Sequence, residues 1–178
     1  ATLSHPWGMD FLDHDTVLVT LRGGGLMRIV LDDGETTAIT GLPEVYNRRQ
    51  GGLLDVAAAD GQIYLCYSAI LDGRSSTAID RAVLVDNALI RRQTIFTGNN
   101  PTRSGHHFGC RLQVAGEMVY ASLGDRGFEA RAKTSIERAV RRALGGTRLR
   151  SGAHRSRWVV DLVGANRSGC FGVGGSQV

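Results

Sequence analysis

A histidine pair and an aspartate are the residues of this sequence best suited to acid–base chemistry. His106 and His107 lead into an apolar segment, and Asp125 follows 18 residues after His107 on a glycine-flanked turn. A neutral imidazole held by a carboxylate is a general base near neutral pH, and alcohol oxidation needs such a base to take the hydroxyl proton. This pattern predicts His107 as the base and Asp125 as its orienting partner.

A third polar cluster, around Gln50, precedes another apolar segment in Arg49-Gln50-Gly51-Gly52-Leu53-Leu54-Asp55. Each cluster also has a structural explanation. The histidines can form a solvent-facing pair, Asp125 can stabilise a Gly-Asp turn, and Gln50 can hydrogen-bond a buried strand end. A histidine pair without a further ligand is weak evidence for a metal, so no metal ligand is assigned.

Repeated strand pairs must position these clusters. A glycine, an apolar strand containing a polar residue, and a second alternating strand recur about every 45 to 60 residues. The three copies are Trp7–Leu12 with Thr16–Thr20, Gly52–Val56 with Gln62–Tyr67, and Gly109–Val114 with Met118–Ser122. Further strand candidates are Leu26–Leu31, Ile79–Val85 and Thr94–Thr97. Four short strands per period predict β-propeller blades, and an ordinary β-sandwich is the alternative.

The last fifty residues differ from the rest. Residues 129–178 carry 10 basic and 3 acidic residues, a formal charge of +7, whereas residues 1–128 carry −3. Apolar positions from Ile136 to Leu144 have helical spacing, with Ser135 as a possible cap. We therefore divide the chain into propeller blades at 1–128 and an irregular or helical basic tail at 129–178. The tail has no interleaved aromatic residues, so we do not expect nucleic-acid binding.

The composition, 42% apolar and 21% charged, is typical of soluble globular proteins. No apolar run approaches the roughly 20 residues that span a bilayer, so no membrane span is expected. Three cysteines, at 66, 110 and 170, are an odd number without a C-x-x-C pair. The sequence therefore does not predict a disulfide framework or a zinc site.

Five short motifs occur in a fixed order over about 125 residues. They are His5-Pro6-Trp7-Gly8, Gly41-Leu42-Pro43-Glu44-Val45, Gln50-Gly51-Gly52-Leu53-Leu54-Asp55-Val56, His107-Phe108-Gly109-x-Arg111-Leu112 and Gly124-Asp125-Arg126-Gly127. In order and spacing they resemble the signatures of soluble aldose sugar dehydrogenases of the glucose/sorbosone dehydrogenase family. The resemblance implies an all-β fold, here a partial six-bladed β-propeller of about two to three blades.

The resemblance also implies a function. Members of the family use pyrroloquinoline quinone (PQQ) and calcium to oxidise the C1 hydroxyl of an aldose to a lactone, and they pass the electrons to an acceptor. Matched by position, His107 corresponds to the catalytic base and Asp125 to its carboxylate partner. Gln50 corresponds to a residue lining the sugar and quinone site, and His106 to a position with a variable polar residue there. A periplasmic or secreted location is implied in the same way.

Departures from the family pattern begin after Gly127. Arg131-Ala132-Lys133-Thr134-Ser135 stands where an Ala-Gln-Asp segment is usual, and the calcium ligands and the cationic residues for the quinone are expected in later blades. A chain with 20 arginines and one lysine suits a GC-rich gene, so we interpret residues 129–178 as an out-of-frame or diverged tail. We expect this chain to be an N-terminal fragment, inactive alone. The alternatives are a non-catalytic β-propeller binding module, a naturally shortened variant, and a basic interaction protein.

Overall fold

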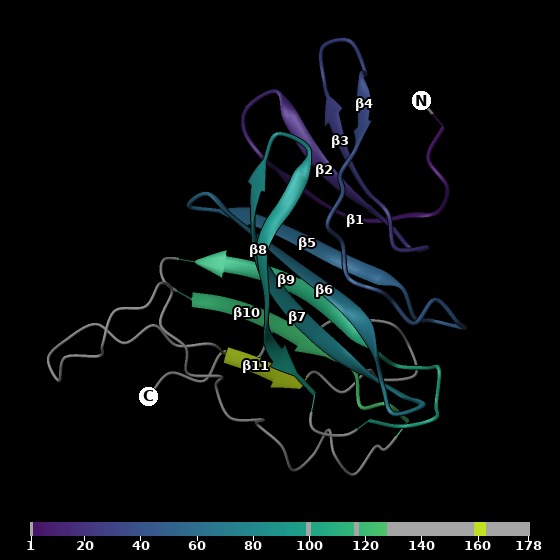
Figure 1. Cartoon of the computed structure of the whole chain (residues 1–178). Helices are drawn as coiled ribbons and strands as arrows, with labels where there is room; N and C mark the ends of the chain where they lie inside the picture. The colour runs from purple at the N-terminus through teal and green to yellow at the C-terminus, as the bar shows by residue number, and fades with distance from the viewer. Residues whose placement is uncertain (1, 99–100, 116–117, 128–158, 163–178) are drawn as a thin grey trace, which may run out of the picture.

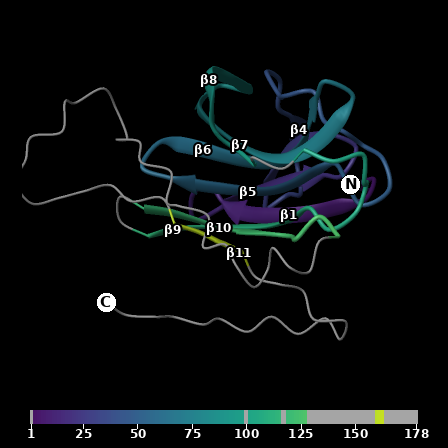
Figure 2. The ribbon, with the colours of Figure 1, turned by 90° about the horizontal axis from the view of Figure 1, so that it is seen from below.

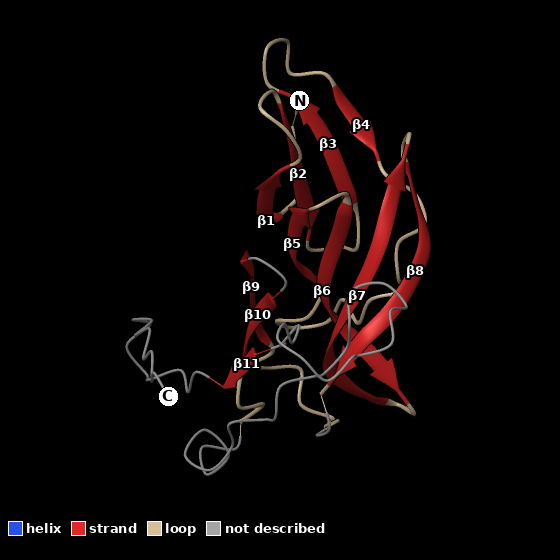
Figure 3. Ribbon diagram, turned by 90° about the vertical axis from the view of Figure 1, so that its left-hand side faces the viewer, coloured by secondary structure: helices blue, strands red, loops and turns tan. Residues whose placement is uncertain are grey.

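The described part of the chain consists of strands and their connections. The computed structural model describes residues 2–98, 101–115, 118–127 and 159–162 (Figure 1). The strands are β1 (Pro6–Phe11), β2 (Thr16–Leu21), β3 (Leu26–Val30), β4 (Thr36–Ala38), β5 (Leu53–Ala59), β6 (Gln62–Leu71), β7 (Arg74–Val85), β8 (Ala88–Thr97), β9 (Gly109–Ala115), β10 (Met118–Leu123) and β11 (Val159–Leu162). Figure 3 shows strands and loops but no helix in these residues, so no membrane-spanning helix is found among them.

Three sheets divide the strands in the manner of propeller blades. Two four-stranded antiparallel meanders have the orders β1-β2-β3-β4 and β5-β6-β7-β8, and the third sheet has the order β11-β10-β9. The first strands of the three sheets lie side by side, with β1 against β5 and β5 against β9 (Figure 2). The fold is therefore all-β, and the predicted partial propeller is confirmed, with two complete blades followed by a third sheet.

Turn residues explain why the second blade is a continuous meander. Asp60-Gly61 joins β5 to β6 and Asp72-Gly73 joins β6 to β7, and all four residues have positive φ. Two consecutive positive-φ residues form a type I′ turn, whose twist matches that of a two-stranded hairpin and which favours Asp-Gly. The sequence thus encodes the tight hairpins of this blade locally.

The second blade supplies core residues to both of its neighbours. Successive side chains of a strand point to opposite faces, so Ile63 and Leu65 pack toward the first sheet while Tyr64 and Cys66 pack toward the third. Leu18 lies in the first of these clusters. Because both faces are covered, β6 is apolar at nearly every position rather than at alternate ones.

Aspartates on the first strands of the blades tie each blade to the next. Asp10 accepts a hydrogen bond from the Ala58 amide at 2.9 Å, and Asp55 accepts one from the Leu112 amide at 2.6 Å. Both bonds run from one first strand to the following one, from β1 to β5 and from β5 to β9. The polar residue inside each predicted apolar strand is thus an inter-blade contact.

A hydroxyl group and a β-bulge recur at one end of every blade. The amides of Gly8, Gly52 and Arg111 donate to hydroxyls on the neighbouring second strands, at 2.8, 2.7 and 3.0 Å. The acceptors are Thr20, Ser68 and Ser122. The strand register shifts at the same point in each blade. Bulges of this kind redirect side chains at the edges of propellers and barrels.

Several expectations needed correction. β4 was not predicted, and β8 begins at Ala88 rather than at Thr94. A strand, β11, lies within the region expected to be irregular or helical, and it pairs with β10 in parallel. The helix predicted near residues 136–144 lies outside the described residues.

The cysteine prediction was wrong in one respect. Cys66 of β6 and Cys110 of β9 form a disulfide between the second and third sheets, with their Cα atoms 6.4 Å apart. They are 44 residues apart in sequence, and only the stacking of two blades brings them together. No local spacing pattern could show this pairing.

Candidate active site

Three of the predicted site residues lie on loops that meet at one end of the blades. Gln50 precedes β5, His107 precedes β9, and Asp125 follows β10. The two long loops are joined directly, because the amide of Gln50 donates to the Gly105 carbonyl at 3.0 Å. Residues separated by up to 75 positions in the sequence therefore share one small region.

His107 and Asp125 form the central pair of this region. The Nδ1 atom of His107 lies 2.8 Å from Oδ1 of Asp125, and the same oxygen accepts a hydrogen bond from the Gly127 amide at 2.8 Å. The aspartate side chain is 7% exposed, whereas that of the histidine is 47% exposed. The carboxylate is thus buried behind an imidazole that faces solvent.

The electrostatics of Asp125 favour its charged form. Burial alone would raise its pKa, but the hydrogen bonds from Gly127 and His107 outweigh burial and hold the pKa below the ordinary value. A carboxylate is only an acceptor, so Nδ1 of His107 carries the proton in this bond. The second ring nitrogen, Nε2, has no hydrogen-bond partner among the described residues, and it is the atom able to accept a proton.

Gln50 holds the backbone of the histidine. Its Oε1 atom accepts a hydrogen bond from the amide of His107 at 2.8 Å. Because the oxygen is used in this way, the carboxamide is oriented and its Nε2 group remains as a donor on the exposed side. The structural alternative for Gln50, a bond to a strand end, is therefore partly correct, since the bonded residue lies just before β9.

His106 is separate from the pair. Its ring lies edge-on to that of His107, with centroids 6.5 Å apart, and no hydrogen bond joins it to Asp125. Its side chain is partly buried. The structure therefore brings together Gln50, His107 and Asp125, and His106 lies beside them in ring contact with His107 but without a hydrogen bond to the pair.

Glycine at position 124 is required by the close approach of two chain segments. A Cβ atom at this position would lie 2.0 Å from the carbonyl oxygen of His107. The Gly124 amide also donates to the Phe108 carbonyl at 3.0 Å. The end of β10 therefore runs against the histidine loop, which is what places the next residue, Asp125, within reach of the ring.

Two arginines of the site were not assigned from the sequence. Arg22 donates through Nε to the Gly51 carbonyl at 3.2 Å and through Nη2 to the Arg49 carbonyl, so it holds the backbone on both sides of Gln50. Arg126 is buried under the histidine loop. The only sequence signal for Arg126 was its place next to Asp125, and a charged residue beside a turn is usually exposed.

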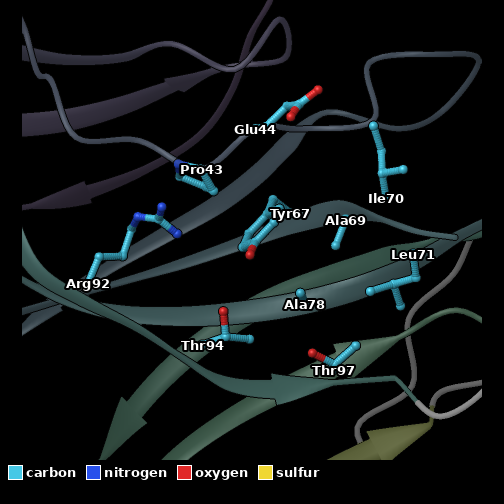
Figure 4. Close-up of a pocket in the computed structure, with 10 residues that line it drawn as sticks. All are labelled: Pro43, Glu44, Tyr67, Ala69, Ile70, Leu71, Ala78, Arg92, Thr94 and Thr97. Atoms are coloured by element: carbon cyan, nitrogen blue, oxygen red, sulfur yellow. The ribbon is translucent and has the colours of Figure 1, made fainter.

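Two concavities on the surface are lined by residues other than Gln50, His107 and Asp125. One of about 240 Å³ lies at β6 and β8, where Figure 4 shows Tyr67, Arg92 and Thr94 among its lining residues. Its polar groups are joined by a network in which Asp80 accepts from Tyr67 and pairs with Arg92. Another of about 280 Å³ lies beside His5 and Arg22. The His107 side chain itself is about half-exposed, at 47%.

The described residues do not supply a calcium site. In residues 2–98, 101–115 and 118–127 no group of three or more His, Cys, Asp or Glu side chains could hold a metal ion. His107 and Gln50 offer exposed polar atoms that could face a quinone or a sugar. No chemical step is therefore assigned to calcium.

A propeller segment whose loops carry an imidazole–carboxylate pair defines the class of this protein. Sequence comparison specifies it further, because the glucose/sorbosone dehydrogenase family matches residues 3–145. The chain belongs to the glucose/sorbosone dehydrogenase family. The family resemblance carried by the five motifs is confirmed.

Known relatives agree with this assignment. The chain is 35% identical to the aldose sugar dehydrogenase YliI of Escherichia coli K12 over 133 residues, which are 69% of this chain and 36% of that protein. The apo structure of the soluble aldose sugar dehydrogenase from Escherichia coli superposes with a TM-score of 0.68 at 34% identity, covering 74% of this chain and 41% of that one.

A second solved relative was determined with a cofactor. The PQQ-bound form of the aldose sugar dehydrogenase from Streptomyces coelicolor superposes with a TM-score of 0.66 at 25% identity, covering 82% of this chain and 43% of that one. This chain spans about a third of the length of the curated relatives it matches. The activity of a whole relative is thus carried by a considerably longer protein.

Proposed function

We propose that this chain supplies the general-base half of a PQQ-dependent aldose dehydrogenase that oxidises the C1 hydroxyl of a sugar to a lactone. The observation that carries the proposal is the 2.8 Å contact between His107 and a buried, ionised Asp125. It leaves one imidazole nitrogen exposed and able to accept a proton. PQQ, when bound, supplies the two-electron acceptor for the hydride that leaves C1.

Each residue of the pair has a separate task. Nε2 of His107 takes the proton of the C1 hydroxyl, so that the C1–O bond becomes a carbonyl as the hydride leaves C1. Asp125 holds Nδ1–H and stabilises the imidazolium that forms. Gln50 fixes the backbone of His107 and has a donor left for a sugar hydroxyl or a quinone oxygen. His106 is a further lining residue on the same loop.

The rest of the assignment follows from the family. Calcium is a proposed cofactor, with ligands expected in the later blades that full-length relatives have. We also propose that the 178-residue chain is inactive alone, since it spans about a third of the length of the curated relatives and no described group of His, Cys, Asp or Glu side chains could hold a metal ion. A periplasmic or secreted location is proposed, and the Cys66–Cys110 disulfide supports it because disulfides persist in oxidising compartments.

A chimera tests the catalytic assignment. Residues 3–127 replace the matching blades of the Escherichia coli relative, and aldose oxidation is measured with PQQ, calcium and an artificial electron acceptor. His107→Ala should lower kcat about 10²- to 10⁴-fold, the usual contribution of a general base. Asp125→Asn should lower it less, because an orienting group is lost rather than the base itself.

Two results would reject the proposal. Full turnover by the His107→Ala chimera would remove the base assignment. PQQ-dependent sugar oxidation by the unmodified 178-residue chain would show that later blades are not needed. Binding of sugar by a chimera with no turnover would instead favour the binding-module alternative.

A further inference from the structure

Arg126 is a buried cation that reaches into the loop carrying the histidines. Its side chain is 5% exposed. Nη1 donates to the carbonyl of His106, and Nη2 donates to the carbonyls of Ser104 at 2.7 Å and of Ser75 at 3.1 Å. One guanidinium therefore joins the start of β7 to the segment that precedes β9.

Three more contacts surround the guanidinium. Nη2 also lies 2.9 Å from the Ser75 hydroxyl and 3.3 Å from that of Thr102, and the central carbon lies 3.5 Å from the centre of the Phe108 ring. No carboxylate in the described residues forms an ion pair with Arg126. Its charge is met instead by carbonyl dipoles and by the face of an aromatic ring.

This arrangement suits arginine and not lysine. Burial lowers the pKa of Arg126 to about 10, so the group is still protonated at neutral pH. Its planar fork can donate to several carbonyls at fixed angles, whereas an ammonium is a compact charge without that geometry. The segment from Pro101 to Phe108 contains no strand. Its backbone is held by an isolated β-bridge between Thr102 and Ser75, by a few further backbone hydrogen bonds and by the contacts of Arg126.

Arg126 contacts the backbone both before and after the Cα atom of His107. Arg126 binds the carbonyl before His107 through Nη1, and its own amide donates to the carbonyl of His107 at 3.3 Å. The preceding residue, Asp125, binds the ring. Two adjacent residues at the end of β10 thus hold the backbone and the side chain of the same histidine.

We propose that Arg126 is a positioning residue for His107. It fixes the loop so that Nδ1 meets Asp125 and Nε2 faces outward, and it does so without touching a substrate. The proposal rests on the proposed function, in which His107 is the base. It adds that the orientation of this base depends on a cation anchored in the neighbouring blade at Ser75.

Histidine NMR on the 178-residue chain tests this without cofactor or substrate. Long-range ¹H–¹⁵N spectra of ¹⁵N-histidine-labelled protein report which ring nitrogen carries the proton, and His107→Gln assigns the signal. The unmodified chain should show His107 protonated at Nδ1. In Arg126→Gln the ratio of the Nδ1–H to the Nε2–H form should fall about tenfold, because several charge-assisted hydrogen bonds that hold the loop are lost.

Arg92→Gln is the matched control. Arg92 is also an arginine bonded to a buried partner, Asp80, and to the Gly41 carbonyl, but it does not contact the histidine loop. It should lower stability and leave the His107 tautomer unchanged. If Arg126→Gln does not fold, Arg126→Lys decides, since it keeps the charge and loses the fork.

The outcomes separate the two proposals. An unchanged tautomer ratio in a folded Arg126 variant would reject the positioning assignment, as would an equal change in Arg92→Gln. An unmodified chain in which His107 is protonated at Nε2 would instead reject the His107–Asp125 arrangement on which the proposed function stands.

Discussion

Asp55 on β5 and Asp125 on the loop after β10 are both buried aspartates, yet their surroundings differ in kind. Asp55 is 1% exposed, and burial raises its pKa despite the hydrogen bond from the Leu112 amide and the charge of Arg111. The pKa of Asp125 is lowered, because hydrogen bonds from Gly127 and His107 outweigh its burial. Asp55 thus joins two blades, whereas Asp125 stays ionised beside His107.

The difference shows what separates a structural carboxylate from a functional one in this fold. Asp55 binds a backbone amide inside the core, and its cationic neighbour Arg111 is 69% exposed. Asp125 binds a side chain that is itself half-exposed and has a free nitrogen. The exposed partner of Asp55 is a guanidinium that cannot accept a proton, whereas the partner of Asp125 is an imidazole with one nitrogen left to accept one.

The first prediction, which includes the largest expected effect on stability, compares the replacement of Asp55 and of Asp125 by alanine. Asp55→Ala should lower the free energy of unfolding by about 2–3 kcal/mol, because the Leu112 amide is left buried without an acceptor. Asp125→Ala should lower it by about 1 kcal/mol, because Gly127 and His107 lie at the surface and water can replace the carboxylate. Urea unfolding followed by circular dichroism measures both. A larger loss for Asp125→Ala would reverse the structural ranking of the two sites.

An effect of intermediate size is expected at the close approach beside Asp125. Gly124→Ala places a methyl group against the His107 carbonyl and should cost about 1–3 kcal/mol, since the two segments must move apart. Gly23→Ala is the control, because the nearest atom to its Cβ position is the Asn47 side chain at 3.8 Å. Equal urea midpoints for the two variants would show that the β10 end does not press on the histidine loop.

The sequence predicted much of the fold because its signals are local. Alternating strands, Asp-Gly turns and the recurring strand pair placed nine of the strands approximately and grouped them into blades. β4 was missed because three residues, Thr36–Ala38, carry no clear pattern. The Cys66–Cys110 bond could not be predicted, since it depends on how β6 and β9 face each other across two sheets.

For the site, residue types were more informative than contacts. The 18-residue spacing of His107 and Asp125 suggested the pair, and the structure brings them within 2.8 Å. Gln50 was expected to line the site, but its bond to the His107 amide was not foreseen. Arg126 entered only as part of the motif Gly124-Asp125-Arg126-Gly127, because its importance lies in carbonyls from two separate segments that only the fold brings together.

The smallest expected effect, and the one that separates the two aspartates most directly, is their dependence on pH. The folded pKa of Asp125 lies below its unfolded value, so its contribution to stability is present above the ordinary pKa of 3.8 and is lost as the pH falls through the folded pKa. The folded pKa of Asp55 lies above its unfolded value of 3.8. Between the unfolded and the folded pKa, the folded state binds more protons than the unfolded state, so the free energy of unfolding rises as the pH falls.

Urea midpoints are measured from pH 6 to pH 3 for each variant. Substituting the two aspartates should change the pH dependence of the midpoint in opposite directions. Asp125→Asn should remove part of the stability that the protein loses as the pH falls. Asp55→Asn, which keeps an acceptor for the Leu112 amide, should remove part of the stability that the protein gains as the pH falls. If both substitutions changed the pH profile in the same direction, the two carboxylates would share one electrostatic setting, and the contrast between a blade contact and an ionised partner of His107 would be wrong.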